Sequence, residues 1–214
     1  MKIYIRAKQK MGFSLIELLS VVAVITILLA ILIPALSKVR NQAKAVGCLS
    51  NMRQIGLAIN MYAMEHNQTL PGPLYLAGGN IVGTKRLPYY IAPYLDRGQA
   101  EDGDSLDVFV CPAWADATQG LEGAGIQYIH VKTSAGKDPF GYPGAKVTAP
   151  PMTLYDIAEG DGLAQTAVLT ELDAQSPIVS SGWGTLAPEP VHGTFRHTLY
   201  FDGRVEKTPL DEAP

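Results

Sequence analysis

The first 16 residues contain no acidic side chain, and no side chain from Leu18 to Leu36 carries a charge. At about 1.5 Å per helical residue, this uncharged run is long enough to cross the hydrocarbon core of a bilayer. The apolar region of an ordinary secretory signal usually has only about 7–15 residues. The sequence also lacks a nucleophile elbow, a phosphate-binding loop, a metalloprotease motif and any internal repeat. It therefore favours a membrane-anchored protein and gives no basis for an enzyme.

Charge is distributed unevenly along the 214 residues. Four of the 17 basic residues precede the apolar run, at Lys2, Arg6, Lys8 and Lys10, and the rest of the chain has 13 basic and 20 acidic residues, a formal charge of −7. Basic residues concentrate on the cytoplasmic side of a membrane segment. The pattern predicts a cytoplasmic N-terminus and an acidic body on the other side, and it argues against nucleic acid as a partner.

One carboxylate, that of Glu17, stands at the start of the apolar run. A carboxylate in lipid is costly, so a charged residue at this depth indicates a function with a specific partner. Five residues before it lies Gly12, followed by the apolar Phe13.

This order of a basic leader, Gly12-Phe13, three residues, Glu17 and a long apolar helix resembles the processing site of type IV pilins and of type II secretion pseudopilins. The resemblance implies that a prepilin peptidase cuts after Gly12 and N-methylates Phe13. In an assembled filament, Glu17 would pair with the α-amino group of a neighbouring subunit's Phe13 and set the register between subunits. Met11 stands where Lys or Arg is usual, and Ser14 replaces the commoner Thr, but neither change removes a group that cleavage needs. An uncleaved anchor and an ordinary secretory signal are the alternatives.

The helical pattern continues beyond the membrane run. Apolar side chains recur every three or four residues on one face, at Val39, Ala43, Val46, Leu49, Met52, Ile55, Ile59 and Tyr62. Gly47 and Gly56 each cost this helix about 1 kcal/mol relative to alanine, so tertiary packing must hold it in place. Pro34 predicts a kink unless neighbouring subunits satisfy the backbone group it frees.

Past the helix, residues 71–190 are rich in glycine, proline and tyrosine, and they predict short strands separated by long loops. We expect strands at Asp107–Val110, Ile126–Val131 and Thr166–Thr170. Near the C-terminus, residues 198–206 predict a hairpin around Asp202-Gly203, in a turn with positive φ at both central positions.

We therefore expect an α+β fold, in which a long N-terminal helix, first transmembrane and then amphipathic, packs against a small antiparallel β-sheet with long loops. The expected divisions are a cytoplasmic leader peptide at residues 1–12 and the transmembrane half of the helix at 13–36. The extracytoplasmic amphipathic half follows at 37–67, and a β-rich headgroup at 68–214.

Three further segments deepen the resemblance. Residues 48–63 look like the helix of a large pseudopilin-like family, and Val108–Pro112 looks like the mid-chain cysteine element of that family. The same family carries near its C-terminus a histidine, nine residues and then Asp-Gly, a spacing found here in His192 and Asp202-Gly203. The role of this motif is left open, and a tight turn is one interpretation of its Asp-Gly pair. Arg204 stands where the family often has a second histidine.

The two cysteines, Cys48 and Cys111, both lie beyond the membrane run. In an oxidising compartment they can form a disulfide, which would stabilise the fold by about 3–4 kcal/mol through loop closure. Two buried thiols are the alternative, because the sequence does not give the distance between the two backbones.

Metal binding has two weak candidates. His192 and His197 lie close to Asp202 in the sequence, but their spacing matches no zinc pattern, which favours a structural or surface role. Asp102, Asp104 and Asp107 offer oxygens to calcium, which some pseudopilins bind. Their run lacks the glycine and the terminal glutamate of the twelve-residue calcium loop, so a solvated acidic loop is the favoured interpretation.

The sequence is therefore interpreted as a structural subunit of a type IV pilus-like or type II secretion pseudopilus filament. The implied partners are prepilin peptidase, other pilin-like subunits in a homo- or hetero-polymer, an inner-membrane assembly platform and the lipid bilayer. The implied place is the bacterial inner membrane, crossed once, with the headgroup periplasmic, or extracellular once assembled. The rival hypothesis is a membrane-anchored extracytoplasmic binding module that uses a pilin-type export signal.

Overall fold

The computed structural model describes residues 15–79, 81–95, 98, 100–121, 127–144, 148–179 and 185–211. Gly12, Phe13 and Ile126 lie outside these ranges. The chain divides into two compact units, an N-terminal unit (Met1–Arg40) and a C-terminal unit (Asn41–Pro214). The first helix, α1 (Leu15–Glu65), contributes residues to both units.

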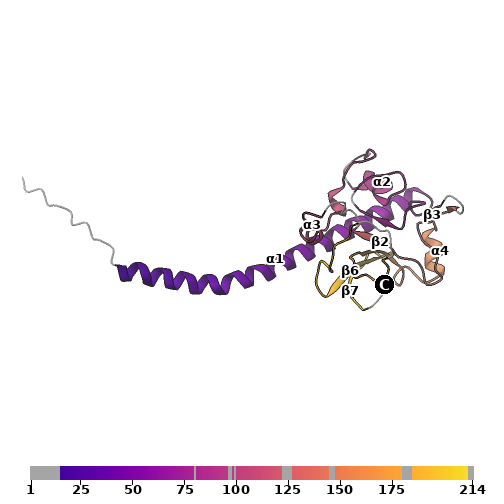
Figure 1. Ribbon diagram of the computed structural model, residues 1–214. Helices are drawn as coiled ribbons and strands as arrows, with labels where there is room; N and C mark the ends of the chain where they lie inside the picture. Colours follow the sequence, from indigo (N-terminus) through magenta and orange to yellow (C-terminus); the bar gives the residue numbers. More distant parts are fainter. Residues whose placement is uncertain are drawn as a thin grey trace, which may run out of the picture. The chain divides into compact units, whose positions relative to one another are not determined.

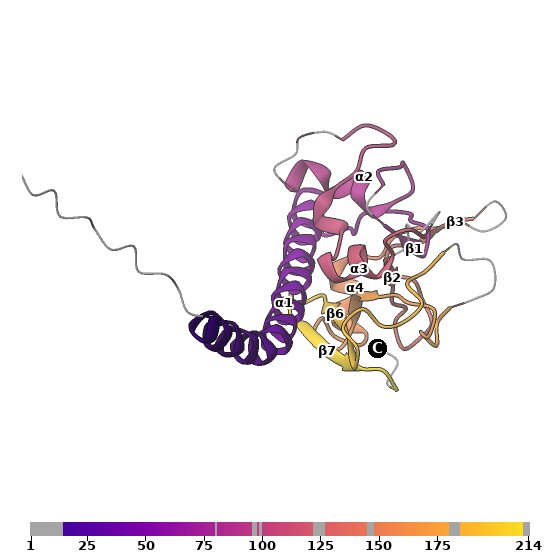
Figure 2. The ribbon, with the colours of Figure 1, turned by 60° about the vertical axis from the view of Figure 1, so that its left-hand side comes forward.

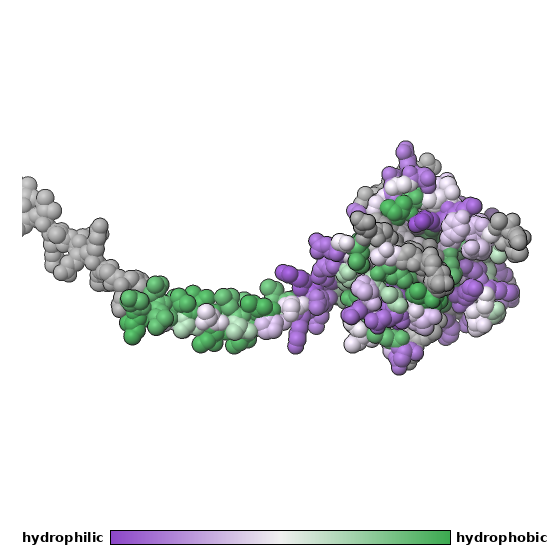
Figure 3. Space-filling model, in the orientation of Figure 1, coloured by the Kyte–Doolittle hydropathy of each residue, from purple (hydrophilic) through white to green (hydrophobic). Residues whose placement is uncertain are grey.

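In the N-terminal unit, every described residue is helical and exposed. Figure 3 shows an apolar surface along this part of α1, which turns hydrophilic near the boundary between the units. Within the described chain, α1 is the helix long and apolar enough to cross a membrane. Pro34 does not end it, and the Ser37 hydroxyl donates a hydrogen bond to the Pro34 carbonyl over 2.9 Å. The expected membrane-length helix is thus present.

The C-terminal unit is built on an antiparallel sheet in the order β1-β2-β5-β6-β7. Its strands are β1 (Ala77–Gly78), β2 (Tyr128–His130), β5 (Ala167–Glu171), β6 (Phe195–Tyr200) and β7 (Val205–Pro209). A second, two-stranded sheet pairs β3 (Tyr142–Pro143) with β4 (Thr148–Ala149). Figures 1 and 2 show β6 and β7 side by side in both views. The α+β fold predicted from the sequence is confirmed.

Short helices fill the long connections between these strands. They are α2 (Leu87–Ile91), η1 (Ala92–Tyr94), η2 (Asp107–Phe109), α3 (Pro112–Ala117) and α4 (Leu154–Glu159). Thr153 caps α4 by accepting the Asp156 N–H, while the Asp156 carboxylate accepts the Thr153 N–H, which satisfies two backbone donors at once.

The core lies between the C-terminal half of α1 and the sheet. Met52, Ile55 and Ile59 are buried in one cluster with Leu169 of β5 and Leu199 of β6. Burial of such side chains stabilises a fold by about 1.5–3 kcal/mol each. The middle of the predicted helix face is therefore the part that packs.

The ends of that predicted face do not pack in the same way. Val39, Ala43 and Val46 are exposed, while Leu49 and Tyr62 are only partly buried.

Gly56 explains why the helix packs most closely against the sheet near residue 56. A β-carbon placed on it would lie 3.0 Å from Cδ1 of Leu199, so its missing side chain lets the helix approach β6.

The strand expected at Asp107–Val110 is wrong. The segment forms η2, in which the Phe109 N–H donates to the Leu106 carbonyl and the Val110 N–H to the Asp107 carbonyl. Leu106 and Phe109 are both buried, and their spacing of three suits a 3-10 turn rather than a strand. The strands expected near 126–131 and 166–170 correspond to β2 and β5.

The C-terminal hairpin forms, but its turn differs from the one expected. Of Asp202 and Gly203, only Gly203 has a positive φ, at 85°. The Gly203 N–H donates to the Tyr200 carbonyl, and the Tyr200 N–H donates to the Arg204 carbonyl. This is a three-residue loop with glycine in the left-handed position, in which Asp202 instead accepts the Arg204 N–H with its side chain.

Candidate functional site

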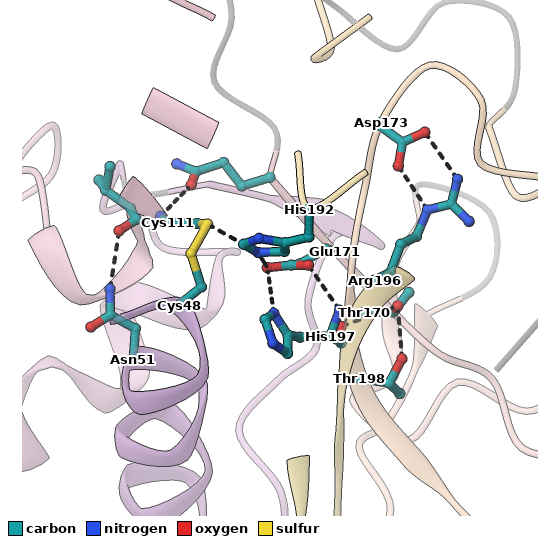
Figure 4. A network of polar contacts seen from close by, with 12 residues as sticks. Cys48, Asn51, Cys111, Thr170, Glu171, Asp173, His192, Arg196, His197 and Thr198 are labelled. Carbon is teal, nitrogen blue, oxygen red and sulfur yellow. Dashed lines mark hydrogen bonds and ion pairs between the residues drawn. A yellow bond between two sulfur atoms is a disulfide. The ribbon is translucent and has the colours of Figure 1, made fainter. Parts of the chain in front are cut away.

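A buried carboxylate, Glu171, lies at the centre of the most polar part of the core. It is the last residue of β5, and its side chain is 6% exposed. Its Oε1 accepts hydrogen bonds from His192 Nε2 over 3.0 Å and from His197 Nδ1 over 3.2 Å. Its Oε2 accepts the backbone N–H of His197 over 2.8 Å. Figure 4 shows Glu171 between the two imidazole rings.

The charge of Glu171 is stabilised by these three donors. Burial alone raises the pKa of this carboxyl, but the hydrogen bonds and the charges of His192 and His197 outweigh burial and lower its pKa below the ordinary value. An ionised carboxylate can only accept, so the two ring nitrogens that face it act as donors. The Glu171 carboxylate is therefore held in its ionised form in the interior.

A disulfide lies on the other side of His192. Cys48 of α1 and Cys111, the residue before α3, are bonded with their α-carbons 4.7 Å apart. The Cys111 sulfur is 3.7 Å from His192 Nε2. Two hydrogen bonds also hold the backbone at Cys111, independently of the disulfide. The Cys111 N–H donates to Gln127 Oε1, and the Asn51 side-chain amide donates to the Val110 carbonyl, each over 3.0 Å.

A buried ion pair between Arg196 and Asp173 lies beside Glu171 and its two histidines (Figure 4). Arg196 of β6 donates to Asp173 through Nε over 2.7 Å and through a terminal nitrogen over 3.0 Å. Both side chains are less than a tenth exposed. A paired, bidentate geometry of this kind is what makes two buried charges tolerable.

The His-x9-Asp-Gly spacing does not converge on one site. His192 precedes β6, whereas Asp202 and Gly203 form the turn after it, so a whole strand separates them. His192 and His197 do come together, with ring centroids 4.6 Å apart, but their shared partner is Glu171 rather than Asp202. The motif thus marks the two ends of one strand.

The acidic loop gathers no group of three potential ligands among the described residues. The Asp104 carboxylate accepts the Glu101 backbone N–H over 2.8 Å, and Asp102 lies beside Gly83. Within the same described ranges, the group of side chains that could hold a metal is Cys48, Cys111, Glu171 and His192. The structure therefore gives no support to calcium binding by Asp102, Asp104 and Asp107.

Of the predicted processing residues, Gly12 and Phe13 lie outside the described residues. Glu17 lies in the first turn of α1 and is exposed there. Sequence reasoning missed Glu171, Asp173 and Arg196. A signal was available for Glu171, because its charge falls within the otherwise uncharged and mostly apolar segment from Ala167 to Leu172.

A groove of about 990 Å³ opens next to the buried cluster. Its lining includes Val46, Leu49, Ala113, His192, Phe195 and Lys207. Lys44 on its edge pairs with Asp116 of α3. The groove combines apolar walls with a few polar groups, as ligand sites do.

Comparison with known proteins finds two family matches. Residues 37–203 match the family described as "Protein of unknown function (DUF1559)", and residues 8–33 match the prokaryotic N-terminal methylation motif. Over 91 residues, the chain is 33% identical to the ComG operon protein 3 homolog of Bacillus licheniformis, covering 42% of this chain and 94% of that protein. No solved structure matches. The chain therefore belongs to the DUF1559 family and is a pilin-like protein with an N-terminal methylation motif.

Proposed function

We propose that this protein is a structural subunit of a type IV pilus-like or type II secretion pseudopilus filament. In this proposal, prepilin peptidase cuts after Gly12 and N-methylates Phe13, and the mature chain assembles through α1. The observation that carries the proposal is an apolar helix whose side chains find no cover within their own unit. Leu15, Ile16 and Ile31 are each more than two thirds exposed, and every other described residue of the run is classed as exposed as well.

So much exposed apolar surface is stable only in lipid or against other apolar helices. The bilayer covers it before assembly, and neighbouring subunits cover it in a filament. The leader charges keep the N-terminus in the cytoplasm, so the C-terminal unit is placed beyond the bacterial inner membrane. An assembly platform in that membrane would deliver the subunits.

In this proposal, Glu17 sets the axial register between neighbouring subunits. A carboxylate at the edge of an apolar helix bundle costs several kcal/mol unless it is paired. The α-amino group of a neighbouring subunit's Phe13 has the opposite charge and the same depth in the membrane. Their pairing would fix one axial stagger among the many that apolar side chains allow.

The test replaces Glu17 in the native host. Glu17→Leu should still insert and be cut, since the apolar run and Gly12-Phe13 are intact, and intact-mass measurement should show a chain that begins at N-methylated Phe13. The sheared, sedimentable polymer should fall at least tenfold. Ser20→Leu, one turn further along the same helix, is the matched control and should assemble normally.

The groove of the C-terminal unit favours a second candidate, a membrane-anchored binding module. Its volume lies in the range of small-molecule sites. An anchored module needs the helix only for attachment, so it would tolerate Glu17→Leu. Polymer at wild-type levels in that variant would therefore contradict the filament and favour the module. A mature chain starting at Met1 or near Ser37 would contradict processing.

A further inference from the structure

Four potential metal ligands meet around the disulfide. The sulfurs of Cys48 and Cys111, a carboxylate oxygen of Glu171 and a ring nitrogen of His192 all lie within 4.8 Å of one another. Two sulfurs, one imidazole nitrogen and one carboxylate oxygen form a ligand set suited to tetrahedral zinc. The chain brings them together from α1, the start of α3, the end of β5 and the loop before β6.

We propose that the reduced form of this protein binds one Zn²⁺ through Cys48, Cys111, Glu171 and His192, and that the disulfide is the oxidised state of this zinc site. In tetrahedral zinc sites, with metal–ligand bonds of about 2.0–2.3 Å, neighbouring ligand atoms lie roughly 3.3–3.8 Å apart. The Cys111 sulfur is 3.7 Å from His192 Nε2, and that nitrogen is 3.0 Å from Glu171 Oε1. Of the six spacings among four ligand atoms, these two are thus met or nearly met, and breaking the S–S bond lets the two sulfurs reach a third. The other three ligand pairs lie within 4.8 Å.

The chemistry balances with a dithiol as reductant. The dithiol passes two electrons and two protons to the disulfide and becomes a disulfide itself, which leaves two thiols on the protein. Zinc binding then displaces both thiol protons to solvent, because thiolates are the ligands. Zinc also displaces the proton on His192 Nε2 to solvent, so that this nitrogen offers a lone pair while Nδ1 keeps its proton. Zinc, two thiolates and one carboxylate then carry a net charge of −1.

The ligands are held in place by contacts that do not depend on the disulfide. Gln127 accepts the Cys111 N–H, and Asn51 holds the Val110 carbonyl. His197 donates to both oxygens of Glu171, through its ring and its backbone. Partners of this kind orient metal ligands, and their loss typically weakens metal binding about 10–100-fold.

The site lies next to the groove. His192 lines the groove of about 990 Å³, while Cys48, Cys111 and Glu171 are buried behind it. The His192 side chain is itself only 2% exposed, so all four ligands are enclosed, and His192 is the ligand that borders the groove.

The experiment uses the full chain in detergent micelles, reduced under nitrogen with a phosphine and then desalted. Titration with Co²⁺ should give one equivalent of a tetrahedral complex with thiolate charge-transfer absorption, which Zn²⁺ then displaces. The oxidised protein should give no such complex. Zn²⁺ should raise the melting temperature of the reduced protein and leave that of the oxidised protein unchanged.

Single variants separate a four-ligand site from two reactive thiols. His192→Ala should weaken binding at least tenfold while thiol counting still finds two cysteines, and Glu171→Gln should do the same with its side-chain shape kept. His66→Ala, which removes an exposed histidine just after the end of α1, is the matched control and should bind like the wild type. Wild-type affinity in both ligand variants, or a reduced wild-type chain that takes up no Co²⁺, overturns the proposal. These outcomes do not depend on filament assembly.

Discussion

The two units use the same kind of residue in opposite ways. Ile27 in the N-terminal unit is 63% exposed, whereas Ile55, on the same helix but in the C-terminal unit, is fully buried. The C-terminal unit buries many of its apolar side chains in a core of its own, while every described residue of the N-terminal unit is exposed. The difference shows that the C-terminal unit has its own core, whereas the N-terminal unit presents a continuous apolar surface.

The side-chain hydrogen bonds of the two units also differ in how far apart their partners lie in the sequence. In the N-terminal unit, Ser20 and Thr26 donate to carbonyls three residues earlier in their own helix. In the C-terminal unit, Glu171 bonds to His197, 26 residues away, and Asp173 bonds to Arg196, 23 residues away. Local bonds need no tertiary structure, whereas distant ones exist only once the sheet has formed.

The largest expected effect comes from removing the covalent link inside the C-terminal unit. Cys48→Ser combined with Cys111→Ser should lower the free energy of unfolding by about 4 kcal/mol, because the disulfide closes a loop of 63 residues. Urea titration followed by the fluorescence of Trp114, which packs in the same cluster as the cysteines, measures it. A loss below about 1 kcal/mol would contradict this expectation, as would the recovery of both cysteines as free thiols by non-reducing peptide mapping of the untreated protein.

A matched pair of substitutions tests the comparison directly. Ile55→Ala should cost the C-terminal unit about 3 kcal/mol, through lost burial and a cavity in the core. Ile27→Ala, the same change in the same helix, should alter the unfolding of that unit by less than about 0.5 kcal/mol. Urea titration of both variants in one detergent decides it, and equal losses would mean that the two units are not independent.

Acid should destabilise only the C-terminal unit, through His130. Burial lowers the pKa of His130 to about 3, so the folded protein excludes a proton that the unfolded chain takes up below pH 6.5. Stability is therefore lost as the pH falls, by about 2 kcal/mol between pH 7 and pH 5. His130→Leu should remove this part of the pH dependence.

The measurement compares urea titrations of wild type and His130→Leu at the two pH values. Asp138 acts in the opposite direction, because burial raises its pKa to about 6, but its contribution is present in both proteins and cancels in the difference. Parallel losses in the two proteins would show that His130 takes no part.

The smallest expected effects come from the two helix glycines, and they have opposite signs. Gly56→Ala should destabilise by about 1 kcal/mol, because its new carbon meets the fully buried Leu199 at 3.0 Å. Gly47→Ala should stabilise by roughly 0.5–1 kcal/mol, because its carbon reaches Pro112 only at 3.4 Å and alanine favours the helix. Thermal melts of both variants should shift in opposite directions, and shifts of the same sign would mean that close approach to β6 is not the reason for Gly56.

The sequence predicts local features well. The apolar period and the absence of charge are enough to predict α1, because they can be recognised without knowing how the rest of the chain folds. Val46 shows the limit, since it continues the apolar period but lies on the wall of the groove, where the core has already ended. Asp107–Phe109 shows a second limit, because a short segment with two apolar residues suits either a strand or a 3-10 turn. Only the packing of the surrounding chain decides between them.

The candidate site was less accessible to sequence reasoning. Its residues come from four separate segments, and Glu171 meets His197 only once β5 pairs with β6. The family spacing drew attention to His192 and Asp202, which a whole strand separates. A charge inside an apolar strand, as at Glu171, was the one local signal of the site.

The bridge between Cys48 and Cys111 also determines how the molecule would respond to mechanical tension. If the chain is pulled from its two ends, load that reaches residue 48 passes through the sulfurs to residue 111 and bypasses the segment between them. About 210 Å of extended chain, 63 residues at roughly 3.3 Å each, stays unavailable for extension. The part of α1 after Cys48, together with α2 and η1, is thereby shielded, and the strands that follow Cys111 bear the load.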